Sequence, residues 1–112
     1  MRESLITSVE VNEDGFIVRR NDAGEESIRW NKIVRIYTYK VDCFTYDMIW
    51  LAFEPKGQGE IHISEETEGF SDFMSVMIWA FPDIDADWYF NVMLPAFAEN
   101  LMGLFDREKQ PA

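Results

Sequence analysis

The sequence predicts a single α+β domain in which an N-terminal antiparallel, strongly bent sheet of about six short strands is followed by C-terminal helices. Apolar residues alternate with polar ones through the first half of the chain, which is the period of a strand. From Phe70 onward they recur at the spacing of a helix. The 112 residues match the size of one domain. We expect this domain to span residues 1–106 and to be followed by a polar tail over 107–112.

Turn residues divide the first half into short strands. Asp14-Gly15 and the Asn21–Gly24 segment each combine residues that favour tight turns. Residues 30–33 interrupt the alternation, which indicates a helical turn or a bulge before the next strand. The segment 46–54 is apolar on both faces, which predicts a central strand that is covered on both sides. The predicted strands are 5–11, 16–20, 26–30, 34–41, 46–54 and 60–64.

The second half reads as helices. Apolar residues at i, i+3, i+4, i+7, i+8 and i+11 from Phe70 predict an amphipathic helix that Pro82 ends. A second helix is expected over Trp88–Met93, since Pro95 interrupts the pattern there. Beyond that proline the apolar stripe predicts a further helical stretch up to Asp106, formed by Ala96, Phe97, Leu101, Leu104 and Phe105.

Three segments carry a family resemblance. They are Trp30-x-x-Ile33-x-x-Ile36-x-Thr38-Tyr39-Lys40-x-Asp42 with Tyr46-Asp47, then Glu65-Glu66-x-x-Gly69-Phe70, then Trp88-x-x-x-Val92-x-x-Pro95-Ala96-Phe97-x-x-Asn100. Together they resemble a group of small uncharacterised bacterial proteins, and the resemblance implies a bacterial cytosolic origin without implying an activity. Short strands closed by C-terminal helices make a pleckstrin-homology-like fold the natural candidate. A flat sheet with two helices on one side is the alternative.

The charge balance restricts the partners. Ten Lys and Arg residues stand against 21 Asp and Glu residues, which gives a net charge of −11. Nucleic acids and anionic membranes repel such a surface, so neither is an expected partner. No apolar stretch has the length of a signal peptide or a membrane span, which predicts a cytoplasmic protein. The single cysteine, Cys43, excludes an intrachain disulfide.

Few residues have the spacing of a catalytic or metal site. Asp83, Asp85 and Asp87 match the first ligands of a calcium loop, but Trp88 and Leu94 occupy its glycine and glutamate positions. We therefore interpret the aspartates as helix-capping linker residues and expect neither a metal nor a cofactor.

The only histidine is the next candidate for chemistry. His62 follows Glu60 on one strand face, so a His–carboxylate pair is possible there. Asp42 and Asp47 flank a turn, where aspartate is common for conformational reasons. Because no Gly-x-Ser-x-Gly motif supplies a nucleophile, we expect no catalytic residue and no enzymatic activity.

Aromatic side chains are more numerous than a small core needs, although core packing accounts for many of them. Tyr and Trp are preferred anchors of protein interfaces. The main functional prediction is therefore a non-catalytic acidic module that binds a basic protein or a second copy of itself, as a homodimer. An immunity protein that neutralises a basic enzyme is one concrete form, by analogy. The candidate partner-binding residues are Tyr37, Tyr39, Phe44, Tyr46 and Trp88.

A pocket for a small apolar ligand is the alternative function. A bent sheet covered by helices rich in Met and Phe could enclose such a pocket. Its lining would come from the central strand and the first helix, namely Trp50, Phe73, Met74 and Met77. A short chain has little core volume to spare, so this function ranks second.

Overall fold

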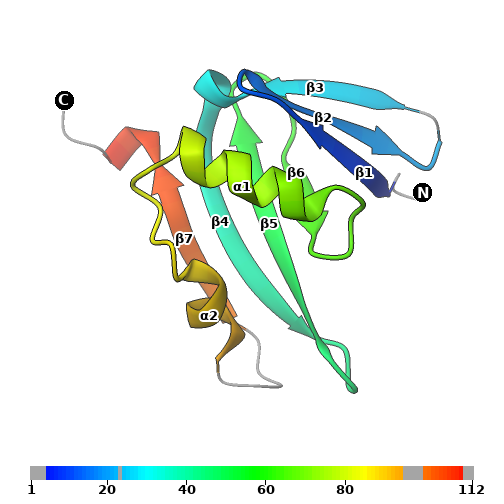
Figure 1. The fold of residues 1–112 in the computed structure, drawn as a ribbon, viewed down its shortest axis with the longest axis vertical. Coiled ribbons are helices and arrows are strands. Elements are labelled where there is room, and N and C mark those ends of the chain that lie inside the picture. The colour runs from blue at the N-terminus through cyan, green and yellow to red at the C-terminus, as the bar shows by residue number, and fades with distance from the viewer. Residues whose placement is uncertain (1–4, 23, 95–99, 110–112) are drawn as a thin grey trace.

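The computed structural model describes residues 5–22, 24–94 and 100–109. They form two antiparallel sheets and two α-helices, so the predicted α+β class is confirmed (Figure 1). The strands are β1 (Ile6–Val11), β2 (Gly15–Arg20), β3 (Glu25–Arg29), β4 (Ile33–Asp42), β5 (Asp47–Pro55), β6 (Ile61–Ser64) and β7 (Asn100–Asp106). The helices are α1 (Phe70–Ala80) and α2 (Trp88–Met93), with 3-10 turns η1 (Trp30–Lys32) and η2 (Arg107–Lys109).

The first three strands form a meander in the order β1-β2-β3. The turn between β1 and β2 is closed by Asn12, whose Oδ1 accepts from the backbone N–H groups of Asp14 and Gly15 at 2.8 and 3.1 Å. Gly15 is required because a Cβ there would lie 2.0 Å from the carbonyl oxygen of Ile28. The break in alternation after β3 is the 3-10 turn η1, as the sequence predicts.

The other four strands form a second sheet in the order β6-β5-β4-β7. The prediction of one bent sheet is therefore wrong, because η1 ends the meander and β4 begins a separate ladder. The described residues also form seven strands rather than about six, and β7 follows the helices. The pleckstrin-homology-like arrangement stays a prediction.

The predicted helical stretch after Pro95 is wrong where the structure describes it. Asn100–Asp106 is β7, which pairs antiparallel with β4 and places Tyr39 opposite Leu101. The i, i+3, i+4 spacing of Leu101, Leu104 and Phe105 is compatible with a helix, but pairing with β4, which lies 60 to 71 residues earlier in the chain, decides the conformation. Residues 95–99, which include Ala96 and Phe97, lie outside the described residues.

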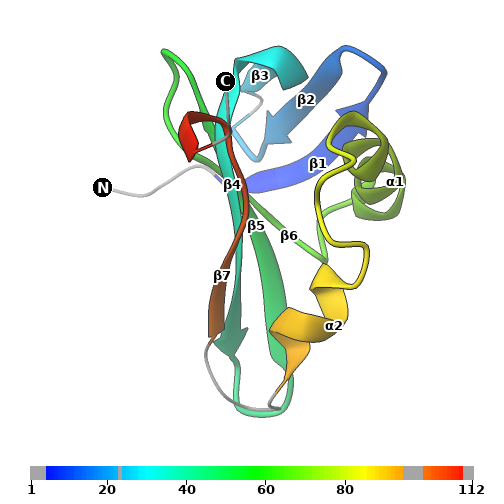
Figure 2. The ribbon, with the colours of Figure 1, turned by 90° about the vertical axis from the view of Figure 1, so that its left-hand side faces the viewer.

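Both helices lie on one side of the four-stranded sheet, and the three-stranded sheet packs at one end of that side (Figures 1 and 2). The core lies between them. Phe16 of β2 contacts Phe73 of α1 edge to face, with ring centroids 4.9 Å apart. The second sheet and the helices contribute these side chains to the hydrophobic core: Ile33, Ile36, Ile49, Leu51, Phe53, Ile61, Ile63, Phe70, Phe73, Met77, Trp88 and Val92.

The central strand β5 is covered on one side only. Ile49, Leu51 and Phe53 are fully buried against the helices. On the other side no helix lies over β5 in the described structure. Met48 and Trp50 are half-buried there, and Ala52 is fully buried between its cross-strand neighbours Tyr37 and His62. The expectation of a strand covered on both faces is therefore wrong. Apolar residues on both faces predict a second layer of structure on each side of the strand. On the side of Trp50, aromatic side chains of the neighbouring strands cover the strand instead.

Residues after β7 continue to contact the sheet. Arg107 Nε donates to the carbonyl oxygen of Ile33 at 2.9 Å, and Glu108 pairs with Arg35. The polar segment predicted after Asp106 therefore begins with residues that pack on the domain. In the described part of the chain, neither α1 nor α2 has the length and apolar character to cross a membrane.

Candidate functional site

The side of the four-stranded sheet that points away from the helices carries a cluster of ring side chains. Strand alternation places them there: Thr38 of β4 is buried on the helix side, so its neighbours in the strand point the opposite way. Strands β4, β5 and β6 all contribute to the cluster, and every member is half-buried. We call it the aromatic face, and it consists of Tyr37, Tyr39, Trp50 and His62.

The rings of the aromatic face contact one another across three strands. Tyr39 and Trp50 lie almost parallel, with centroids 6.1 Å apart and planes 2° apart. His62 meets Tyr39 and Tyr37 with its ring tilted or on edge, at centroid distances of 5.7 and 6.3 Å. The side chains hold one another in place, so a partner would meet a surface that is already ordered.

Hydrogen bonds fix the polar ends of these rings. Tyr39 OH and His62 Nδ1 are 2.8 Å apart, and His62 Nε2 lies 2.9 Å from Glu60 Oε1. Tyr37 OH donates to the same oxygen of Glu60 at 3.1 Å. A neutral imidazole with its proton on Nε2 satisfies both contacts, because Nδ1 then accepts from Tyr39. The His–carboxylate pair that the spacing predicts is therefore present.

The two phenols of β4 are hydrogen-bond donors rather than bases. Burial, followed by the hydrogen bond to Glu60, raises the pKa of Tyr37 to about 12. Burial and the charge of Glu60 also raise the pKa of Tyr39. Both hydroxyls therefore keep their protons at neutral pH and can donate hydrogen bonds.

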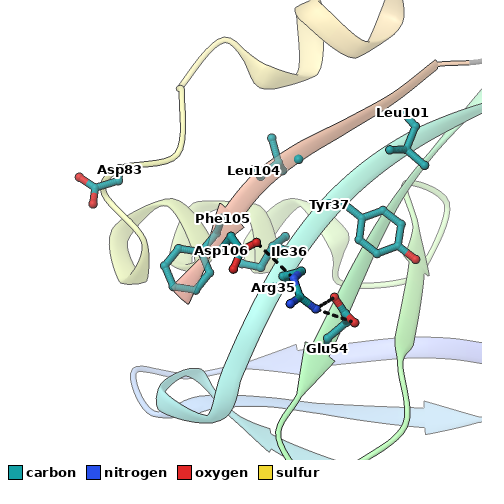
Figure 3. A pocket seen from close by; sticks show the side chains of 10 residues that line it. Arg35, Ile36, Tyr37, Glu54, Asp83, Leu101, Leu104, Phe105 and Asp106 are labelled. Atoms are coloured by element: carbon teal, nitrogen blue, oxygen red, sulfur yellow. Dashed lines mark hydrogen bonds and ion pairs between the residues drawn. The ribbon is translucent and has the colours of Figure 1, made fainter. Parts of the chain in front are cut away.

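Carboxylates surround the aromatic face. Arg35 of β4 forms ion pairs with Glu54 at 3.1 Å and Asp106 at 3.2 Å (Figure 3). It forms a third ion pair with Glu108. These three carboxylates and that of Glu60 outnumber the Arg35 guanidinium four to one. The local excess of negative charge has the sign of the whole chain, whose net charge is −11.

An open hollow of about 920 Å³ runs along β7 beside this face (Figure 3). Gly103 is one of its lining residues, and no atom lies within 4 Å of the position that a Cβ would take there. Leu101, two residues earlier, is 69% exposed. The lining residues are Arg35, Ile36, Tyr37, Glu54, Asp83, Leu101, Gly103, Leu104, Phe105 and Asp106.

The structure brings together only part of the predicted partner-binding set. Tyr37 and Tyr39 are on the aromatic face, whereas Phe44 and Tyr46 lie in the turn between β4 and β5. Phe44 is 93% exposed and has a φ of 74°, a conformation that bulky residues rarely adopt. Trp88 is 1% exposed, so its assignment to a binding surface is wrong. The first turn of α2 directs its indole into the core beside Tyr89.

The predicted apolar pocket does not form as one site. Phe73 and Met77 are fully buried in the core, and Met74 packs half-buried against it. Trp50 lies on the opposite side of the sheet, on the aromatic face. The sheet separates Trp50 from the residues of α1, so the four side chains do not line one cavity.

Two parts of the site were not predicted from the sequence, namely Arg35 and the pair of Leu101 and Gly103. Arg35 has the same parity along β4 as Tyr37 and Tyr39, so strand alternation was a signal that could have placed it on this face. No local signal could have found Leu101 and Gly103, because they reach the face only through the pairing of β7 with β4.

The chain was also compared with known proteins. Comparison with protein-family models, with curated proteins and with solved structures found no match.

Proposed function

We propose that the protein is a non-catalytic interaction module that binds a basic protein through the aromatic face. The observation that supports this function best is the array of stacked Tyr39 and Trp50 rings bordered by the carboxylates of Glu54 and Glu60. Lys and Arg side chains bind to such surfaces, because the ring faces attract cations and the carboxylates form charge-assisted hydrogen bonds.

The net charge supports the same class of partner. A charge of −11 attracts a basic protein over long range and raises its association rate. Tyr and Trp provide large contact area at a low entropic cost, and they are enriched among the residues that dominate binding energy. An inhibitor that neutralises a basic enzyme, as an immunity protein does, is the concrete form of this function that we favour.

The test is affinity capture from a lysate of the source organism with the wild-type protein and three variants, each immobilised. Trp50→Ala removes one stacked ring, and Glu60→Gln removes one charge while keeping the shape of the side chain. Trp79→Ala is the matched control, because Trp79 is 65% exposed on α1, away from the face.

We expect the wild-type protein and Trp79→Ala to retain the same basic protein, and the two face variants to lose most of it. Added salt should weaken the capture, since screening shortens the range of the charge attraction. Loss of the captured protein with Trp79→Ala alone would place the binding surface on α1. Capture that is indifferent to salt and to Glu60→Gln would contradict a basic partner.

A further inference from the structure

We propose, beyond the function above, that β7 pairs antiparallel with β7 of a second copy of this chain, so that the two four-stranded sheets become one continuous sheet. β7 is an edge strand in the order β6-β5-β4-β7. An edge strand has backbone N–H and C=O groups that can pair with another strand. The partner must therefore present an extended backbone.

The other edges in the described structure are protected. Along β1, the backbone of Val9 donates to the carbonyl oxygen of Glu68 at 2.9 Å, so a loop covers that edge. At β3, the Gln58 side chain reaches the Glu26 carboxylate and the carbonyl oxygen of Ser27. β6 is only four residues long, with His62 bound to Glu60 beside it. Short strands and charged or covering side chains are the usual ways to block edge pairing.

β7 lacks such protection over most of its length. No charged residue occurs between Asn100 and Phe105, and Leu101 is exposed. A β-bulge follows, because Ile36 pairs with Phe105 while Tyr37 pairs with Gly103, which leaves Leu104 unpaired with β4. The bulge bends the strand and limits regular pairing to the part that precedes it.

One register makes this part of β7 self-complementary. With Met102 opposite Met102 of the second copy, Leu101 lies opposite Gly103 of the second copy, and the same contact repeats across the two-fold axis. Leu101 and Gly103 point to the same side of the strand, since they are two residues apart before the bulge. The exposed leucine of each copy then occupies the space at the other copy's glycine.

The second copy fits this edge better than a basic strand does. The paired residues carry no charge, so the strand offers a basic peptide no carboxylate in the pairing register. Each copy carries −11, so repulsion opposes the dimer at low salt and screening favours it. A short strand pairing is at the low end of interface sizes, and we expect a dissociation constant of roughly micromolar order.

The first test is sedimentation of the full chain over a concentration series at low and high salt. We expect a monomer–dimer equilibrium that shifts toward dimer as salt rises. Leu101→Lys places a charge in the interface, and Gly103→Val fills the space that receives Leu101. Each should raise the dissociation constant about tenfold or more. Trp79→Lys, an equally exposed apolar residue on α1, should leave it unchanged.

The second test is disulfide trapping in a Cys43→Ser background. In the proposed register the two Met102 Cα atoms are about 4.5–5.5 Å apart, so Met102→Cys should form a covalent dimer. The two Leu104 residues would be about 14 Å apart, which is too far for a disulfide. Leu104→Cys should therefore form no covalent dimer under oxidation.

Three results would overturn the proposal. The first is a monomer at all concentrations and salt levels, and the second is cross-linking through Leu104→Cys but not Met102→Cys. The third is a protein that sediments as a monomer and whose Gly103→Val variant no longer captures the basic protein from lysate. That result would assign the β7 edge to a strand of the captured protein. The dimer assays use no partner, so they can succeed or fail independently of the proposed function.

Discussion

Tyr39 and Trp50 are cross-strand neighbours whose rings stack almost in parallel on the uncovered side of the four-stranded sheet. This relationship links the stability of the domain to its proposed binding function. Trp50 is half-buried by its neighbours on the sheet rather than enclosed in the core. Its ring is therefore available to a partner, and its removal affects the fold only in part.

Trp50→Ala should lower the free energy of unfolding by about 1–2 kcal/mol, because half of a large side chain and one ring contact are lost. Phe73→Ala, at a fully buried ring that contacts Phe16 and Phe53, should cost about 3–5 kcal/mol. Urea unfolding of both variants measures the difference. Equal losses for the two variants would contradict an uncovered outer side of β5.

Lys40→Met should destabilise the protein by about 3–5 kcal/mol. The Lys40 ammonium is buried, donates to the carbonyl oxygen of Met93 at the end of α2, and lies 3.7 Å from the Asp47 carboxylate. The variant removes the bond that ties α2 to β4 and leaves the carboxylate without this positive charge.

Denaturant unfolding tests the role of Lys40. Lys56→Met, at an exposed lysine after β5, is the control and should change stability by less than about 0.5 kcal/mol. The double variant Lys40→Met, Asp47→Leu should recover part of the loss, since it removes both charges. A single variant as stable as the control would contradict the buried ion pair.

Gly69→Ala should cost more than about 2 kcal/mol, whereas Gly103→Ala should be nearly neutral. Gly69 precedes α1 with a φ of 90°, and a Cβ there would lie 2.1 Å from the carbonyl oxygen of Val9. The corresponding space at Gly103 is open. Thermal unfolding of the two variants gives the comparison, and a Gly69→Ala protein of unchanged Tm would rule out this close approach.

Stability should fall as the pH rises from 10 toward 12. Burial and a hydrogen bond to Glu65 raise the pKa of Tyr89 from 10.0 to about 12. In the unfolded chain this phenol loses its proton first, so alkaline pH favours unfolding in that window, and the contribution is fully present below it. Tyr89→Phe should make the decline of stability with pH shallower. Tyr37, whose pKa is also about 12, should account for part of the decline that the variant retains.

Urea midpoints measured below and above pH 10 test this dependence. Tyr89→Phe should also be less stable than the wild type at neutral pH, because Glu65 loses its link to α2. An identical pH dependence in the two proteins would contradict the bond between Tyr89 and Glu65.

Local patterns predicted most of the elements and part of the site. Alternation and turn residues located β1 to β6, and helical spacing located α1 and α2, since these signals act over a few neighbouring residues. The pairing of His62 with Glu60 and the shared face of Tyr37 and Tyr39 also follow from a two-residue period. Trp88 was assigned to the same surface in error, because an aromatic residue in a short helix carries no signal of its exposure.

The α+β class, the acidic charge and the alternation of residues along each strand follow from composition and from neighbours in the chain. The division of the strands into two sheets, the strand conformation of Asn100–Asp106 and the side of β5 that carries no helix in the described residues follow from contacts between distant segments. One cause accounts for all three. A strand is completed by hydrogen bonds to a distant segment, and a side chain is buried by whichever element folds over it. The site that we propose depends on both kinds of long-range contact. In the described structure β7 forms the edge beside the aromatic face, and both helices lie on the opposite side of the sheet, which leaves that face open.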